Sequence, residues 1–201
     1  MKNVNKQLTH RQRQALETQR IIIEAARDLF LEQGYGATTN EAISAKAGVS
    51  ISTLYTIYKN KRGILHAIRE HWHLQSGQRD IYNQAIDEPE PSRKLELAAH
   101  ATRRQWETGL SMITIYKGAA ATDLEAASEL QDALDGRRNE MRQFIETISP
   151  ILRNDIHIDQ ATAIYLALTH SELYHELVEV AGWSPDDYEL WLAKTLQQQL
   201  L

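Results

Sequence analysis

The chain contains no cysteine among its 201 residues, so disulfide bonds and thiolate zinc sites are both excluded. It has only four prolines, and no segment approaches the roughly 20 apolar residues needed to span a bilayer. The N-terminus also lacks the apolar stretch of a signal peptide. We therefore expect a soluble, cytoplasmic protein with no membrane partner, in which the 42% of hydrophobic residues form a sizeable core.

Alternating runs of β-branched residues are absent too, and apolar residues recur at helical spacing along almost the whole chain. The first strong stripe contains Ile22, Ala25, Ala26, Leu29 and Phe30, and it stops at Gly34. This periodicity predicts an all-α fold of about nine helices.

Capping residues mark several helix starts after this first helix. Thr38 and Glu41 have the spacing of a capping box for a short helix that ends at Gly48, and Ser50 is the expected N-cap of a helix over 51–58. Asn60 is expected to cap a longer helix that continues to about Ala85. After a linker at 87–92, further helices are predicted at 93–107, 111–120, 123–148, 159–182 and 186–200, the last opened by Ser184 and Pro185.

Charge is distributed unevenly between the two ends of the chain. Residues 1–63 hold ten Lys/Arg and five Asp/Glu, a net charge of +5, whereas the remainder carries −10. A basic first third on an acidic body indicates that one end faces a polyanion.

Residues 38–58, TTNEAISAKAGVSISTLYTIY, have the spacing of a helix-turn-helix, whose second helix enters the DNA major groove. Ile43, Val49, Leu54 and Ile57 are expected to face inward. The polar side chains left for the outside are Ser50, Ser52, Thr53, Tyr55, Thr56 and Tyr58. Hydroxyl groups donate well to phosphate oxygens, so this surface is predicted to bind a sugar-phosphate backbone.

Residues from about 20 to 66 resemble the DNA-binding domain of the tetracycline-repressor (TetR) family, through AARDLFLEQGYGATT, ISAKAGVS and STLYTIYKNK. The resemblance implies phosphate contacts for Thr39, Thr53, Tyr55 and Lys61, and places Ser50, Ser52, Thr56 and Tyr58 near the groove. Two features depart from the family pattern: Arg62 follows Lys61 where an acid is common, and 47–58 has no Lys or Arg. That helix therefore supplies no bidentate arginine for reading guanine.

The basic N-terminal stretch KNVNKQLTHRQRQ has two interpretations. It either reaches the adjacent minor groove as an arm or remains a solvated tail. We place the arm and the helix-turn-helix domain in residues 1–63, and a ligand-binding and dimerisation domain, which the family resemblance implies, in residues 64–201.

The last two predicted helices carry wide apolar surfaces and resemble the dimer interface of one branch of the family, through ELYHELVEVAGWSPDDYELWLAKTL. A homodimer is expected, although burial inside one subunit would also explain these surfaces. A cavity for a small molecule is predicted among bulky residues and one arginine, which are otherwise ordinary core: Trp72, Arg104, Trp106, Met112, Tyr116, Met141, Phe144 and Tyr165. Arg138 is a further residue that could pair with an acidic ligand.

Catalytic and metal-binding motifs are missing. His66, Glu70 and His73, and the pair His170 and His175, lack the H-E-x-x-H spacing of a zinc enzyme. We expect no catalytic residue, no metal and no cofactor. The sequence thus predicts a homodimeric repressor that binds double-stranded DNA at a palindromic operator and is released by a small molecule; the alternative is a helical binding module without DNA-binding activity.

Overall fold

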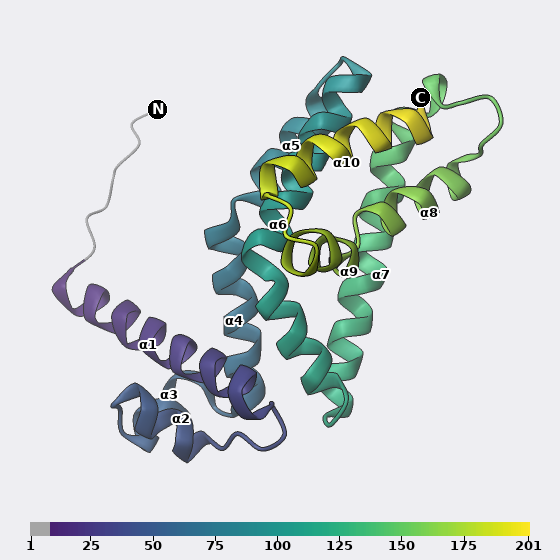
Figure 1. The fold of residues 1–201 in the computed structure, drawn as a ribbon. Coiled ribbons are helices and arrows are strands. Elements are labelled where there is room, and N and C mark those ends of the chain that lie inside the picture. Colours follow the sequence, from purple (N-terminus) through teal and green to yellow (C-terminus); the bar gives the residue numbers. More distant parts are fainter. Residues whose placement is uncertain (1–8) are drawn as a thin grey trace.

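The structure is a computed structural model that describes residues 9–201, and all regular elements in this range are helical (Figure 1). The all-α prediction is confirmed, with ten α-helices. The helices are α1 (His10–Gln33), α2 (Asn40–Ala47), α3 (Ile51–Tyr58), α4 (Lys61–Ser76), α5 (Gln78–Asp87), α6 (Pro91–Ala120), α7 (Leu124–Glu146), α8 (Ile158–Leu168), α9 (Ser171–Tyr174) and α10 (Pro185–Leu200), with a 3-10 turn at Ser149–Ile151 and a π-helix at His175–Val180. None of the described helices is long and apolar enough to cross a membrane.

The first three helices form a lobe at one end of the molecule (Figure 1). Ser50 caps α3 as predicted, and its hydroxyl accepts a hydrogen bond from the backbone N–H of Thr53 at 3.1 Å. The cap of α2 lies one residue later than predicted, because the hydroxyl of Thr39 accepts from Ala42 N–H at 3.1 Å. Thr38 is buried instead, and its hydroxyl donates to the carbonyl of Gly34 at 2.8 Å.

Three expected helix boundaries were wrong. The helix predicted over 159–182 is broken at residues 169–170, between α8 and α9. The helix that begins after Asn60 ends at Ser76, because Gly77 adopts a left-handed conformation with φ of 63° and separates α4 from α5. In contrast, α6 runs unbroken through the predicted gap at 108–110. A single glycine in a helix costs about 1 kcal/mol, which packing can offset, and Gly109 is buried against the Trp72 ring.

Two hydrophobic clusters hold the molecule together. One joins α1–α3 to α4, α6 and α7 through side chains such as Phe30, Leu54, Leu65 and Tyr116. The other occupies the body among α5–α10. The predicted domain boundary after residue 63 falls inside α4, whose apolar residues Ile64 and Ile68 belong to the first cluster; this division stays a prediction.

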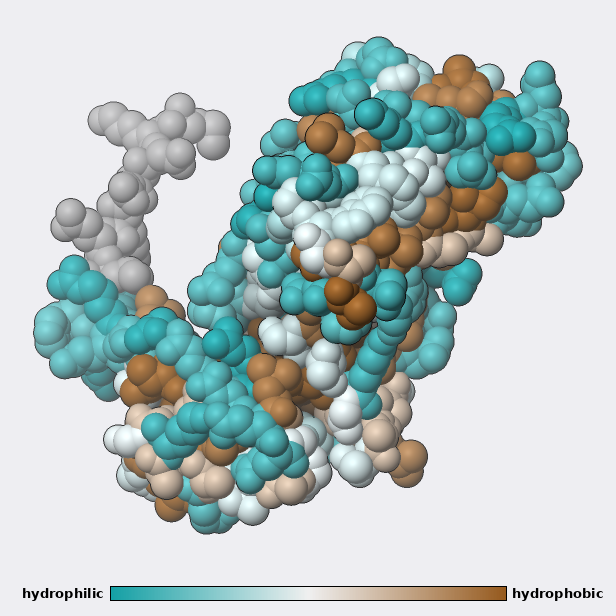
Figure 2. Space-filling view, viewed as in Figure 1, coloured by the Kyte–Doolittle hydropathy of each residue, from teal (hydrophilic) through white to brown (hydrophobic). Residues whose placement is uncertain are grey.

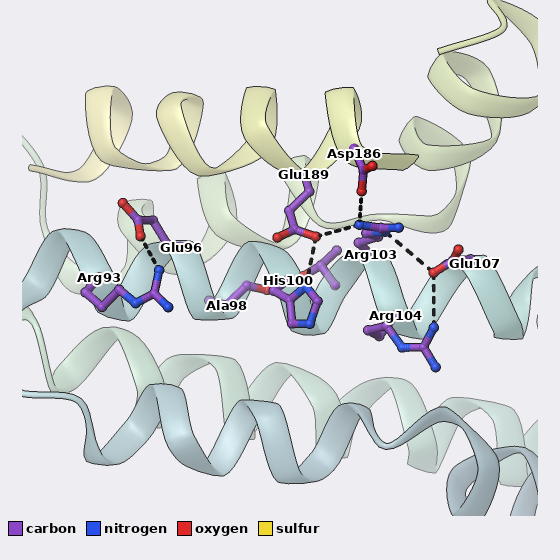
Figure 3. A network of polar contacts seen from close by, with 10 residues as sticks. Arg93, Glu96, Ala98, His100, Arg103, Arg104, Glu107, Asp186 and Glu189 are labelled. Carbon is purple, nitrogen blue, oxygen red and sulfur yellow. Dashed lines mark hydrogen bonds and ion pairs between the residues drawn. The ribbon is translucent and has the colours of Figure 1, made fainter. Parts of the chain in front are cut away.

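A polar network on the surface of the body ties α10 to α6 (Figure 3). Arg103 pairs with both Asp186 and Glu189 of α10, and the His100 Nδ1 atom lies 2.8 Å from a carboxylate oxygen of Glu189. Arg103 also faces Glu107 at 3.5 Å on its own helix. Because several charges share partners, the network fixes the register of the two helices better than one exposed pair would.

Candidate functional site

The turn between α2 and α3 is fixed by its own hydrogen bonds. Gly48 takes the left-handed conformation, with φ of 67°, that ends α2. Next to it, the Ser44 hydroxyl donates to the Val49 carbonyl at 2.6 Å, and the Val49 N–H donates to the Ser44 carbonyl at 3.1 Å. Ile43 and Leu54 are fully buried below the turn. The angle between the two helices is therefore set by the protein core rather than by a ligand.

Most of the residues predicted to bind DNA through hydroxyl groups are exposed on the lobe. Thr39, Ser50, Ser52, Tyr55 and Thr56 are exposed, and the Tyr55 side chain retains 45% of its accessible surface. The Ser50 hydroxyl lies 2.8 Å from that of Ser52 and 2.7 Å from that of Thr53, which is half-buried. We call the six residues Thr39, Ser50, Ser52, Thr53, Tyr55 and Thr56 the hydroxyl surface.

The other two predicted DNA-binding residues direct their polar atoms toward the protein itself. The Tyr58 hydroxyl donates to the carbonyl of Gln19 at 3.3 Å, and burial raises the pKa of this phenol to about 12. The Lys61 ammonium group donates to the carbonyls of Tyr35 at 2.6 Å and Thr38 at 2.9 Å, and burial lowers the pKa of this lysine. Both therefore connect elements of the lobe, and a DNA contact for either one stays a prediction.

Several cations of the lobe are likewise paired within the chain. Arg62 forms an ion pair with Glu125 of α7, and Lys46 lies 3.0 Å from Glu32. Lys59 is exposed and, within residues 9–201, has no carboxylate within 4.0 Å. Of the three cations that follow α3, Lys59, Lys61 and Arg62, mainly Lys59 is therefore left to face DNA. The segment KNVNKQLTHRQRQ divides: residues 2–8 lie outside the described residues, and the rest belongs to Thr9 and the exposed start of α1.

A cavity of about 700 Å³ lies in the body, among α4, α5, α6, α7 and α8. Seven of the eight residues predicted for a ligand line it: Trp72, Trp106, Met112, Tyr116, Met141, Phe144 and Tyr165. These side chains also belong to the hydrophobic core. The same residues therefore pack the core and line a cavity. Whether a ligand binds there stays a prediction.

Arg104 is the predicted residue that does not line this cavity. Its guanidinium lies 3.3 Å from the Glu107 carboxylate and donates to the Ser76 carbonyl at 3.4 Å. Arg138, also considered for a ligand acid, is exposed and outside the lining. The arginines that line the cavity are Arg69, Arg79 and Arg137, the neighbour of Arg138, and sequence reasoning missed all three. The spacing could have predicted Arg137, because Arg137, Met141 and Phe144 lie at i, i+4 and i+7 on one helix face.

Other polar residues of the cavity wall were also missed. The Tyr82 hydroxyl donates to the sulfur of Met141 at 3.2 Å, and burial raises the pKa of this phenol. Burial and the charge of Arg79 lower the pKa of His73 to about 4, so this imidazole is neutral near pH 7. Trp72 donates from its indole nitrogen to the Thr108 hydroxyl at 3.0 Å, which sets the orientation of this ring. In the described part of the chain, no three His, Asp or Glu residues are close enough to hold a metal ion.

The lobe matches a known family. Residues 22–68 fit the family described as bacterial regulatory proteins, tetR family. The uncharacterized HTH-type transcriptional regulator YvkB of Bacillus subtilis (strain 168) is 41% identical over 51 residues, which is 25% of this chain and only 27% of that protein. The chain therefore carries, at residues 22–68, a domain that matches the tetR family of bacterial regulatory proteins. The prediction that the chain is not an enzyme is in line with this match to a family of regulatory proteins.

Solved structures resemble the chain over most of its length. SmeT in complex with triclosan has a TM-score of 0.72 at 21% identity and covers 92% of each chain. NalD of Pseudomonas aeruginosa, the secondary repressor of the MexAB-OprM multidrug efflux pump, has a TM-score of 0.70 at 20% identity and covers 94% of this chain and 98% of that one. The fatty acid degradation regulator FadR of Bacillus halodurans has a TM-score of 0.69 at 16% identity, with 89% and 94% covered. At these identities the likeness shows the fold, a helix-turn-helix lobe on a helical body.

Proposed function

We propose that the chain is a transcription regulator that binds double-stranded DNA through the hydroxyl surface, and that it acts as a homodimeric repressor released by a small molecule. The observation that carries the proposal is the division of polar groups in the lobe. Ser44, Tyr58 and Lys61 direct their polar atoms to the protein's own backbone, whereas the Tyr55 side chain remains exposed on α3. Thr56 is exposed too, although its hydroxyl donates to the Ser52 carbonyl at 2.8 Å. Such a surface on the second helix of a helix-turn-helix suits a DNA groove.

The contacts of this surface with DNA follow from its chemistry. The phenol of Tyr55 and the hydroxyls of Thr39, Ser50 and Thr53 donate to phosphate oxygens. Ser52 and Thr56 of α3 are then left to face base edges, where hydroxyls bind with low selectivity. Because α3 has no arginine or lysine, much of the specificity is assigned to the sequence-dependent shape of the operator.

Helix α4 supplies a connection between the lobe and the cavity. At its start, Lys61 binds the Tyr35 and Thr38 carbonyls of the segment between α1 and α2. Farther along, the Tyr116 hydroxyl donates to the Leu65 carbonyl at 3.2 Å, and Trp72 lines the cavity. A ligand that displaces Trp72 or Tyr116 changes the position of α4 relative to α6. If that ligand prefers the displaced state, it shifts the dimer away from the spacing that fits DNA.

The dimer interface is assigned to α8–α10. Hydrophobic side chains gather on the face of the body that carries these helices (Figure 2). Val180 and Leu190 keep 61% of their surface exposed, and Trp183 keeps 36%. Two such faces would form a four-helix interface with two-fold symmetry and would place two copies of α3 roughly 34–36 Å apart on a palindromic operator. A protein with this function works on chromosomal DNA, so we assign it to the cytoplasm.

Binding to the DNA that flanks the chain's own gene tests the proposal, with fluorescence anisotropy at several salt concentrations as the readout. Affinity is expected to fall steeply as salt rises, because phosphate contacts release counterions. Tyr55→Phe is expected to weaken binding about 3- to 10-fold on every sequence alike, through loss of one hydrogen bond. The control is Tyr188→Phe, which removes a hydroxyl that is buried in the body and has no hydrogen-bond partner in the described residues.

The alternative, a helical binding module without DNA-binding activity, is favoured by one observation: Lys46, Lys61 and Arg62 are all engaged within the chain. It predicts weak binding with no preference for the flanking DNA, and equal affinity in the Tyr55→Phe and Tyr188→Phe variants. Either result contradicts the proposed regulator.

A further inference from the structure

Arg137 is the feature of the cavity wall that the packing of the body does not explain. Its side chain is half-buried on α7 and lines the cavity. One nitrogen, Nη2, donates to both the carbonyl and the hydroxyl of Thr169, each at 2.9 Å. The guanidinium carbon lies 5.4 Å from the centre of the Trp106 ring. Among residues 9–201, no carboxylate lies within 4.0 Å of this guanidinium. A positive charge is thus held inside the body without an ion-pair partner.

The remaining donors of this guanidinium are accessible. A guanidinium has five N–H donors, and only those on Nη2 have a hydrogen-bond partner in the described part of the chain. The fully enclosed polar atoms without a partner there belong to Asn40, His73, Arg103 and Tyr188, and none belongs to Arg137. Its Nε and Nη1 donors are therefore not fully enclosed by protein atoms, and the side chain that carries them lines the cavity.

The other charged groups of the wall leave this positive charge unbalanced. Arg69 lies 3.5 Å from Glu70, so these two largely neutralise each other. His73 is uncharged near pH 7, because its pKa is lowered to about 4. Arg79 and Arg137 then face a single carboxylate, Glu140, which lies beyond ion-pair distance of Arg137. Desolvation makes an unpaired charge costly, and an anionic ligand would relieve that cost.

Much of the rest of the wall is apolar and aromatic, beside the uncharged polar residues Gln78, Asn83, Thr102, Gln105, Gln143 and Thr147. The Phe144 ring lies 5.3 Å from that of Tyr82 and 5.5 Å from that of Tyr165, and Met112 and Met141 add flexible thioethers. A cavity of about 700 Å³ accepts a molecule of drug size. The wall therefore has a part with excess positive charge and an apolar part, which suit a ligand with one anionic end and one apolar end.

We propose that the effector is an amphipathic organic acid, whose carboxylate or similar planar oxyanion accepts hydrogen bonds from Nε and Nη1 of Arg137 and whose apolar body packs against Phe144, Tyr165 and the methionines. The inference rests on the proposed function, since it names the ligand of the same regulatory cavity. A guanidinium binds a carboxylate through two parallel hydrogen bonds, which selects for the planar anion.

Three probes with the same naphthalene body test the charge preference by isothermal titration calorimetry on the full chain. They are 2-naphthylacetate, its neutral amide 2-naphthylacetamide, and the cation 2-naphthylethylammonium. The acid is expected to bind about 10-fold or more tightly than either of the others. Equal or tighter binding of the amide or the cation overturns the proposal, and so does absence of binding by the acid up to about 1 mM.

Substitution of the arginine assigns the preference to one residue. Arg137→Gln is expected to lose the preference for the acid and to retain the affinity for the amide, a result that also shows that the variant is folded. Arg137→Lys should recover part of the preference. The matched control is Arg138→Gln, which removes an exposed arginine of the same helix outside the cavity. Persistence of the acid preference in Arg137→Gln, or its loss in Arg138→Gln, contradicts the assignment.

The same titration separates this inference from the proposed function. If 2-naphthylacetate binds through Arg137 and leaves the affinity for the flanking DNA unchanged, the ligand class is supported and release by that ligand is refuted. If DNA binding is present and salt-dependent but the acid shows no preference, the regulator is supported and the ligand class is refuted.

Discussion

The ammonium group of Lys61 donates a hydrogen bond to the backbone carbonyl of Tyr35 at 2.6 Å, across 26 positions of the chain. Because the same group also binds the Thr38 carbonyl at 2.9 Å, the start of α4 is fastened to the segment that leads into α2. The side chain that the family resemblance assigns to a phosphate thus has a structural role before any DNA arrives.

Lys61→Met is therefore expected to lower the free energy of unfolding by about 1–3 kcal/mol, because it leaves two half-buried carbonyls without a donor. Urea unfolding at pH 7 measures this change. Lys59→Met is the control: Lys59 is exposed, so its loss should leave stability nearly unchanged and weaken DNA binding. A Lys61→Met variant as stable as the parent protein would show that the carbonyls find other donors.

Gly63→Ala is expected to destabilise the lobe, although helix propensity alone predicts that alanine would stabilise it. Alanine is favoured over glycine inside a helix by about 1 kcal/mol. At Gly63, however, a Cβ atom would lie only 2.1 Å from the Tyr58 carbonyl oxygen. Gly118→Ala in α6 is the control, since a Cβ there meets nothing within 4 Å. Thermal unfolding should show a lower midpoint for Gly63→Ala and an unchanged or higher midpoint for Gly118→Ala; the reverse order would contradict this account.

Gly109→Ala is expected to alter the cavity rather than the lobe. A Cβ at Gly109 would lie 2.8 Å from the Trp72 indole, which must then move from its hydrogen bond with Thr108. Tryptophan emission should shift, and affinity for 2-naphthylacetate should change at least about 3-fold, a difference of about 0.7 kcal/mol. DNA affinity without ligand reports whether the displaced ring also moves α4. Unchanged emission and unchanged ligand affinity together would show that the ring is free to adapt.

His73 should make stability depend on pH below neutrality. Its pKa lies at about 4 in the folded protein, against an ordinary value of 6.5, so the unfolded chain takes up the proton first as pH falls. The contribution of His73 to the free energy of unfolding is fully present above pH 6.5 and is lost as the pH falls from 6.5 toward 4. His73→Gln should reduce the slope of unfolding free energy against pH in that window and change little at pH 7.5. An identical slope in both proteins would refute the burial of this ring.

Leu190→Glu is expected to convert the proposed homodimer to monomers. Leu190 keeps 61% of its surface exposed on α10, and a charge buried in an interface is costly. Sedimentation velocity measures the change. Leu74→Glu is the control, because Leu74 is even more exposed, at 85%, but lies on α4 away from the assigned interface. A monomeric parent protein, or equal behaviour of the two variants, would place the interface elsewhere.

Local signals in the sequence were sufficient for much of the lobe. Ser50 and Asn60 cap the helices that follow them, and Gly48 ends α2. Each of these effects depends on residues within one helical turn, which is why a single sequence predicts them. The same holds for the start of α10 at Ser184 and Pro185. Where a local signal was ambiguous, as with the adjacent Thr38 and Thr39, the choice followed the burial of one side chain.

The residues of the cavity wall also include some that the sequence predicted and some that it did not. Its large aromatic and methionine residues were predictable because bulky apolar side chains on helices face the middle of a bundle. The sequence predicted Arg104 in the cavity wall, where the structure has Arg137. Arg104, Arg137 and Arg138 are alike in the sequence and differ in the side chains and carbonyls that neighbouring helices place beside them. Arg137 meets Thr169 and Trp106, which are distant in the sequence.

By itself the sequence determined the helical class, the helix-turn-helix and its family, since these depend on periodicity, caps and a contiguous motif. Only the tertiary structure decided that Tyr58 and Lys61 turn toward the protein backbone and that Arg137 faces the cavity without a carboxylate. The physical reason is the length of the side chains involved: a lysine, arginine or tyrosine places its polar atoms several ångströms from its own backbone. Their partners are therefore set by packing between helices and not by the residues beside them in the chain.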